Sequence, residues 1–154
     1  MNLLNYSLAA LLSYLGLFAG LLLAIIAKEE LKAGKKYFII TKKVIIALIF
    51  ISIIFLAQLK HVLILIALLI ITTSLVKYSK TELVKTHYTY LLFSAIFYLS
   101  SKRLELFAVS SSLIFLYGLP AGTLLSYKTK KEAITNILKN VVFVVIAIAI
   151  YIIF

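Results

Sequence analysis

The chain has 154 residues, of which 64% are hydrophobic and 14% are charged, and its net charge is +11. A soluble domain is nearer half apolar and a quarter charged, so a water-soluble globule of this length would have too many apolar side chains to bury. The composition therefore predicts a single domain embedded in lipid. There is no cysteine, which excludes disulfides, thiolate metal sites and cysteine nucleophiles. We expect the positive charge to contact lipid headgroups rather than nucleic acid.

Charged residues divide the sequence into six apolar segments. Because backbone polar groups must be satisfied internally in lipid, such segments are expected to be helices. The predicted fold is an all-α, polytopic membrane bundle of about six helices, formed by a single domain over residues 1–154. The expected helices, in chain order, are Leu3–Ala27, Tyr37–Leu59, Val62–Val76, Lys80–Ser101, Leu104–Tyr127 and Lys130–Phe154.

Two short polar patterns mark the starts of the fourth and sixth segments. Ser79 precedes Glu82 by three residues, and Thr129 precedes Glu132 by three. In a capping box, the hydroxyl and the carboxylate satisfy the first free amides of a helix. Both patterns therefore predict a helix start beside a basic loop.

Other residues mark the expected helix ends. Gly34, in the first basic loop, is suited to end the first helix in a left-handed conformation. Six tyrosines, among them Tyr6 and Tyr90, lie near expected helix ends. Tyrosine is enriched at both membrane–water interfaces, so we expect an aromatic belt there.

Lysine and arginine are distributed unevenly between two sets of loops. Thirteen of the sixteen lie in or beside the first, third and fifth loops, and three lie in the second and fourth. Since cytoplasmic loops carry the excess of positive charge, we expect a multi-pass cell-membrane protein with these three loops in the cytoplasm and both termini outside. The lysines expected to contact anionic headgroups are Lys28, Lys32, Lys35, Lys36, Lys128, Lys130 and Lys131.

Small residues line one face of the first segment and part of the fifth. Each segment has a GxxxG motif, which lets two helix backbones approach closely in lipid. The eight residues from Gly16 and the eight from Gly118 agree at six positions; an internal repeat and independent recurrence of a common motif both remain open. The expected helix-packing residues are Ala9, Ser13, Gly16, Gly20, Ala24, Gly118 and Gly122.

Pro120 lies between the two glycines of the fifth segment. Proline removes a backbone hydrogen bond, so it either kinks a packing helix or breaks the helix to form a substrate site. The residues of such a broken-helix site are Ser111, Gly118, Pro120 and Gly122. Acidic, basic and histidine residues are absent from the centres of the expected spans, which argues against proton pumps and ion transporters.

Three functions remain open. The leading expectation is a non-catalytic scaffold or accessory subunit that packs through its small-residue faces, as a homo-oligomer or in a larger membrane complex. The alternatives are a small transporter or channel for a neutral or lipophilic solute at Pro120, and an enzyme acting on lipid headgroups with Glu29 and Glu30. The sequence has no recognisable motif for a metal, a cofactor or a catalytic group.

Overall fold

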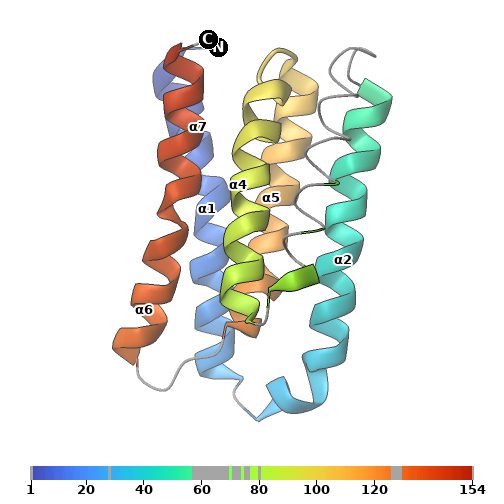
Figure 1. Ribbon diagram of the computed structural model, residues 1–154, viewed down its shortest axis with the longest axis vertical. Coiled ribbons are helices and arrows are strands. Elements are labelled where there is room, and N and C mark those ends of the chain that lie inside the picture. The colour runs from blue at the N-terminus through green and yellow to red at the C-terminus, as the bar shows by residue number, and fades with distance from the viewer. Residues whose placement is uncertain are drawn as a thin grey trace.

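A computed structural model describes residues 2–27, 29–56, 70, 74, 77–79, 81–125 and 130–153. Within these ranges the chain is helical and has no β-strand. The elements are α1 (Leu3–Ile26), α2 (Glu30–Leu56), α4 (Glu82–Ser100), α5 (Leu104–Leu124), α6 (Lys130–Leu138), the 3₁₀ helix η1 (Lys139–Val141) and α7 (Val142–Ile153), as labelled in Figure 1.

Four helical stretches are long and apolar enough to cross a membrane. They agree with the all-helical membrane fold expected from composition. The 19-residue α4 is not one of the four, and the segment expected at Val62–Val76 lies outside the described residues except at positions 70 and 74. The four stretches are Leu3–Ile26, Ala33–Ile54, Leu104–Leu124 and Glu132–Ile153.

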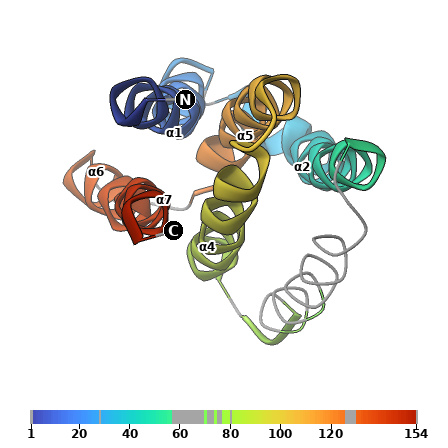
Figure 2. The same ribbon diagram turned by 90° about the horizontal axis from the view of Figure 1, so that it is seen from above.

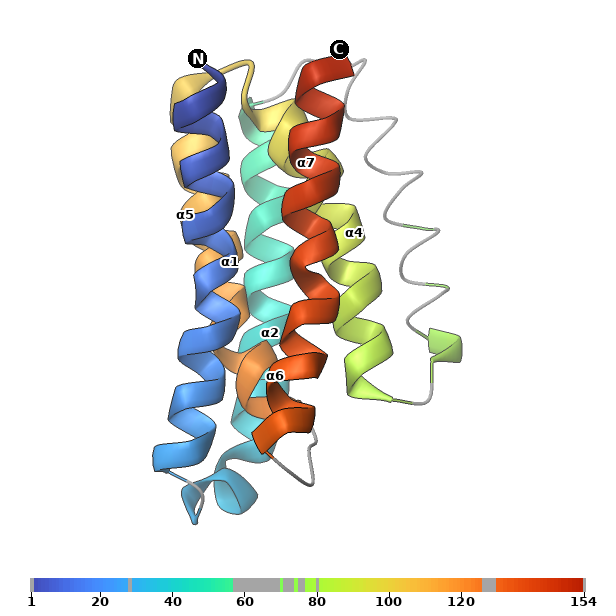
Figure 3. The ribbon, with the colours of Figure 1, turned by 90° about the vertical axis from the view of Figure 1, so that its left-hand side faces the viewer.

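The long axes of the helices run along one bundle (Figure 1). Seen from above, α5 lies between α1 and α2 and also contacts α4, while α7 packs against α1 and α4 (Figure 2). The two chain termini lie at the same end of the bundle (Figure 3). The opposite end holds the end of α1, the start of α2, the start of α4, the end of α5 and the start of α6.

Aromatic rings fill much of the core. The rings of Tyr6 and Phe97 lie 5.1 Å apart, and the Tyr6 hydroxyl donates a hydrogen bond to the Ala147 carbonyl at 3.1 Å. Deeper in the bundle, the rings of Tyr90 and Phe143 lie 5.5 Å apart. Tyr6 and Tyr90 are 0% and 1% exposed, so the expectation that they belong to an interfacial belt is wrong.

The loop expected between the first two helices is much shorter in the structure. α1 ends at Ile26, and α2 begins at Glu30 rather than at Tyr37. Gly34 therefore lies inside α2, and none of the described glycines has a positive φ, so its expected role in ending the first helix is wrong. The reason is that Glu, Leu, Lys and Ala are strong helix formers, and one glycine costs a helix only about 1 kcal/mol.

The start of α4 also differs from the capping-box prediction. The helix begins at Glu82, and Thr81 is its N-cap, accepting a hydrogen bond from the Val84 amide at 3.4 Å. Ser79 is not the cap, because the Glu82 carboxylate is engaged in ion pairs instead of closing a capping box. In the second pattern, Thr129 lies outside the described residues.

Candidate functional site

The two GxxxG motifs lie against each other inside one chain. A methyl group added at Gly118 would lie 2.5 Å from the Gly16 carbonyl carbon, and one added at Gly122 would lie 2.9 Å from the Gly20 Cα. The contacts advance in the same direction along both helices, so α1 and α5 are parallel. We call these four residues the glycine seam; they let the two backbones touch where any larger side chain would separate them.

Small polar residues extend the seam toward the end that carries the termini. The Ser13 hydroxyl lies 2.8 Å from the Ala9 carbonyl of its own helix and 3.1 Å from the Ser111 carbonyl of α5. Ala24, on the other side of the seam, is fully buried. Beside Ser13 there is a groove of about 470 Å³, and its lining residues are Ala9, Leu12, Ser13, Ser111, Ser112, Phe115 and Leu116.

Pro120 does not interrupt α5, which continues as one helix from Leu104 to Leu124. The Thr123 hydroxyl donates a hydrogen bond to the Pro120 carbonyl at 2.9 Å, and the Ser111 hydroxyl donates to the Ala108 carbonyl at 3.0 Å. Hydroxyls that bond their own helix in this way satisfy backbone carbonyls locally. The expected broken-helix site is therefore not formed in α5, and its glycines belong to the seam.

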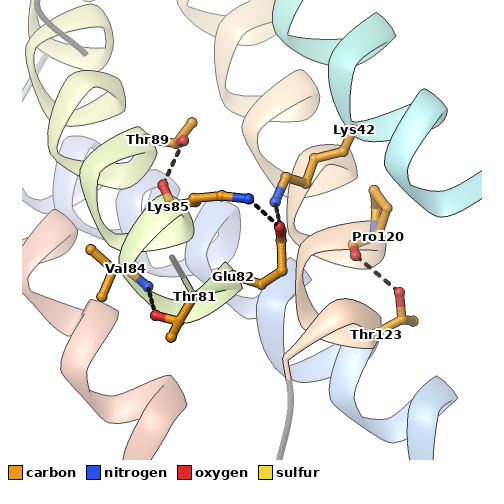
Figure 4. A network of polar contacts seen from close by, with 8 residues as sticks. All are labelled: Lys42, Thr81, Glu82, Val84, Lys85, Thr89, Pro120 and Thr123. Atoms are coloured by element: carbon orange, nitrogen blue, oxygen red, sulfur yellow. Dashed lines mark hydrogen bonds and ion pairs between the residues drawn. The ribbon is translucent and has the colours of Figure 1, made fainter. Parts of the chain in front are cut away.

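A cluster of charged side chains, which we call the charged centre, joins α2 to α4. The Lys42 ammonium lies 2.9 Å from one oxygen of the Glu82 carboxylate, and the Lys85 ammonium lies 2.9 Å from the other oxygen. The Lys42 side chain is 12% exposed, and the other two are 31% exposed. In Figure 4 the carboxylate lies between the two ammonium groups and beside the part of α5 that contains Pro120 and Thr123.

The three residues of the charged centre lie in helices and not in a loop. Lys42 is inside the candidate span Ala33–Ile54, and its ammonium lies 5.9 Å from the centre of the Tyr117 ring. Tyr117 comes seven residues before Leu124, the last residue of α5, which is about 10 Å along a helix. Because α2 begins at Glu30 rather than at Tyr37, Lys42 lies twelve residues after the helix start instead of five. This brings an ionisable residue closer to the centre of a candidate span than we expected.

Buried hydroxyl groups lie beside the charged centre. The Tyr117 hydroxyl is next to those of Thr86 and Thr89 and close to Glu82. The hydroxyls of Thr86 and Tyr117 are both buried. Because a hydroxyl can both donate and accept hydrogen bonds, these side chains are suited to contact a polar ligand.

Two of the lysines expected to contact lipid, Lys35 and Lys36, have exposed side chains on α2. Lys28 and Lys128 lie outside the described residues. Glu29, proposed for an enzyme at this face, is exposed in the turn between α1 and α2, and the described parts of the chain bring together no group of acids and histidines able to hold a metal ion. The expected lipid-contacting lysines, apart from Lys28 and Lys128, lie in the first turns of α2 and α6, at the same end of the bundle: Lys32, Lys35, Lys36, Lys130 and Lys131.

No protein-family model, curated protein or solved structure matches this chain. The functional argument therefore rests on the geometry of the glycine seam and of the charged centre.

Proposed function

We propose that the chain is a multi-pass protein of the cell membrane with six crossing helices and its basic loops in the cytoplasm. The four apolar helices support four crossings. We assign a fifth crossing to α4, whose 19 residues extend about 28 Å, and the sixth to the apolar segment at 62–76. The position of both termini at one end of the bundle (Figure 3) agrees with an even number of crossings.

The topology can be tested with single cysteines, because the natural chain has none. Lys35→Cys reports on the basic end of the bundle, and Ser101→Cys reports on the end that carries the termini. In intact cells, an impermeant thiol reagent should label Ser101→Cys at once and Lys35→Cys only after the membrane is permeabilised. The reverse pattern would invert the orientation, and labelling of both in intact cells would exclude the odd number of crossings that the proposal puts between them.

The proposal of an accessory subunit loses its original support. It rested on two small-residue faces being available to a partner or to a second copy. In the structure the four glycines of the seam contact one another's helices, so these faces are occupied within the chain. A subunit role would have to use another surface.

We infer instead that the chain is a small transporter for an anionic solute, and the charged centre is the observation that carries this inference. Ionisable side chains are expensive inside a membrane protein and usually mark a solute or ion pathway. Two ammonium groups share one carboxylate, so one positive charge is in excess. A bound anion would balance that charge, and the buried hydroxyls of Thr86 and Tyr117 would help to orient it.

Lys42 and its neighbour Lys43 offer a matched pair of variants for a binding test. Both are lysines of α2, but Lys43 is exposed whereas Lys42 is held against Glu82. The melting temperature of the purified protein would be measured in chloride, acetate and inorganic phosphate, with gluconate as the reference at equal ionic strength. A ligand that binds only the folded state raises this temperature.

At least one of the three small anions should stabilise the natural protein and the Lys43→Gln variant. Losing a charge-assisted hydrogen bond costs about 1.5–3 kcal/mol, so Lys42→Gln should weaken anion binding by roughly tenfold or more. Equal stabilisation of Lys42→Gln, or the absence of stabilisation by all three anions, would contradict the inference.

A further inference from the structure

A second groove, of about 570 Å³, opens between α4 and the C-terminal helices. Its described lining shares no residue with the charged centre. Four of its lining residues are apolar or aromatic, and the other two are a histidine and a lysine. The lining residues are Leu83, Val84, His87, Tyr88, Lys139 and Val142.

Both walls of this groove change from polar to apolar at the same level. On one wall, Lys139 lies where the polar α6 gives way, through η1, to the wholly apolar α7. On the other wall, His87 follows the charged first turn of α4 and precedes its apolar part. In a membrane protein such a change marks the boundary between headgroups and acyl chains.

We propose that this groove binds one anionic phospholipid. The headgroup phosphate would accept hydrogen bonds from the Lys139 ammonium and from a His87 ring N–H, and an acyl chain would lie along Tyr88 and Val142, which follow these two residues toward the apolar parts of their helices. The described lining residues include no acidic side chain, so they suit a negative group. The inference rests on the proposed membrane location but on neither the charged centre nor the transport activity.

A phospholipid is favoured over a free anion because the groove is amphipathic. A free phosphate ion would use only Lys139 and His87, and the apolar walls would contribute nothing to its binding. A lipid uses both parts of the groove, because burying its acyl chain against the walls adds a favourable hydrophobic contribution.

Native mass spectrometry of the protein in mild detergent would test the site. The probes are phosphatidylglycerol and phosphatidylcholine with identical acyl chains, with inorganic phosphate as a competitor. Lys139→Gln removes the charge, Val142→Trp fills the apolar wall, and Lys43→Gln is the control for loss of one exposed lysine. Each variant is used once its melting temperature shows that it is folded.

The natural protein and Lys43→Gln should bind phosphatidylglycerol in preference to phosphatidylcholine. One lysine beside an anionic headgroup is worth about a fivefold change in affinity, so Lys139→Gln should bind roughly fivefold less phosphatidylglycerol. Val142→Trp should bind less of both lipids. Unchanged phosphatidylglycerol binding by Lys139→Gln would overturn the proposal, and so would full competition by inorganic phosphate, which would indicate a free-anion site. Neither result would bear on anion binding at Lys42.

Discussion

Replacing Gly20 by alanine should destabilise the bundle, whereas the same change at Gly34 should not. Alanine is a better helix former than glycine by about 1 kcal/mol, and this gain applies to both variants because both glycines lie inside helices. Comparing the two variants therefore cancels the helix-propensity term. What remains is the effect of the added methyl group on its surroundings.

The surroundings of the two methyl groups differ in kind. At Gly20 the methyl would overlap the Leu119 carbonyl oxygen and lie 3.0 Å from the Gly122 Cα, and both are backbone atoms. At Gly34 the nearest atom is a ring carbon of Phe38 at 3.1 Å, and a side chain can rotate aside. Overpacking a close contact costs about 1–3 kcal/mol, so Gly20→Ala should be less stable than Gly34→Ala by that amount.

Thermal unfolding in mild detergent, followed by circular dichroism, would measure this difference. For a chain of this length, 1 kcal/mol shifts the melting temperature by about 2–4 °C, so Gly20→Ala should melt roughly 2–12 °C below Gly34→Ala. Adding Gly122→Ala to Gly20→Ala should cost less than the sum of the single changes, because the two Cα atoms are neighbours. Equal melting temperatures for Gly20→Ala and Gly34→Ala would refute the seam as the source of α1–α5 packing.

Three further outcomes are expected. Lys42→Met should lower the free energy of unfolding by more than Lys42→Met combined with Glu82→Gln, because the single change leaves a partly buried carboxylate with one fewer partner; an additive result in the double-mutant cycle would argue against the ion pair. Tyr14→Phe should lose about 1 kcal/mol of stability, because it removes the buried hydrogen bond of 2.6 Å to the Ile137 carbonyl, and an unchanged urea midpoint would contradict that contact. When the lysines of the last basic loop are changed to glutamine, less anionic lipid should co-purify, because each lysine contributes about 1 kcal/mol to binding at an anionic surface. An unchanged lipid profile would argue against their role. These lysines are Lys128, Lys130 and Lys131.

Helices could be located from the sequence where an apolar stretch ends abruptly at charge. α1 and α5 begin at the expected residues, Leu3 and Leu104, and the C-terminal helices extend from Lys130 as expected. The start of α2 could not be found in this way, because four of the seven residues from Glu30 to Lys36 are charged, yet all of the seven except Gly34 are good helix formers. Hydropathy indicates whether a segment faces lipid or water, but it does not locate the start of a helix that continues from one into the other.

The partner of a small-residue face is not encoded in its spacing. The GxxxG motifs at Gly16 and Gly118 predict close packing, but a second copy, another protein and another helix of the same chain all satisfy that pattern. The arrangement of α1 beside α5 decides between them, and it depends on how every other helix packs.

The charged centre was missed for a related reason. Lys42 and Glu82 lie forty residues apart and belong to different helices, so only the folded chain brings them together. One local signal was present: Lys42 is followed by a long apolar run, and extending the helix back to Glu30 places this lysine well inside it. Recognising the helix-forming residues before the run would have placed Lys42 well inside a candidate membrane span.

Flux measurements would show whether the charged centre carries an anion across the membrane. Purified protein would be reconstituted in liposomes, and uptake of labelled chloride, acetate and inorganic phosphate would be followed for the natural chain, Lys42→Gln and Lys43→Gln. We expect uptake of at least one anion above that of protein-free liposomes for the natural chain and Lys43→Gln, and its loss in Lys42→Gln. Uptake no faster than in protein-free liposomes, or uptake that survives Lys42→Gln unchanged, would contradict the proposal.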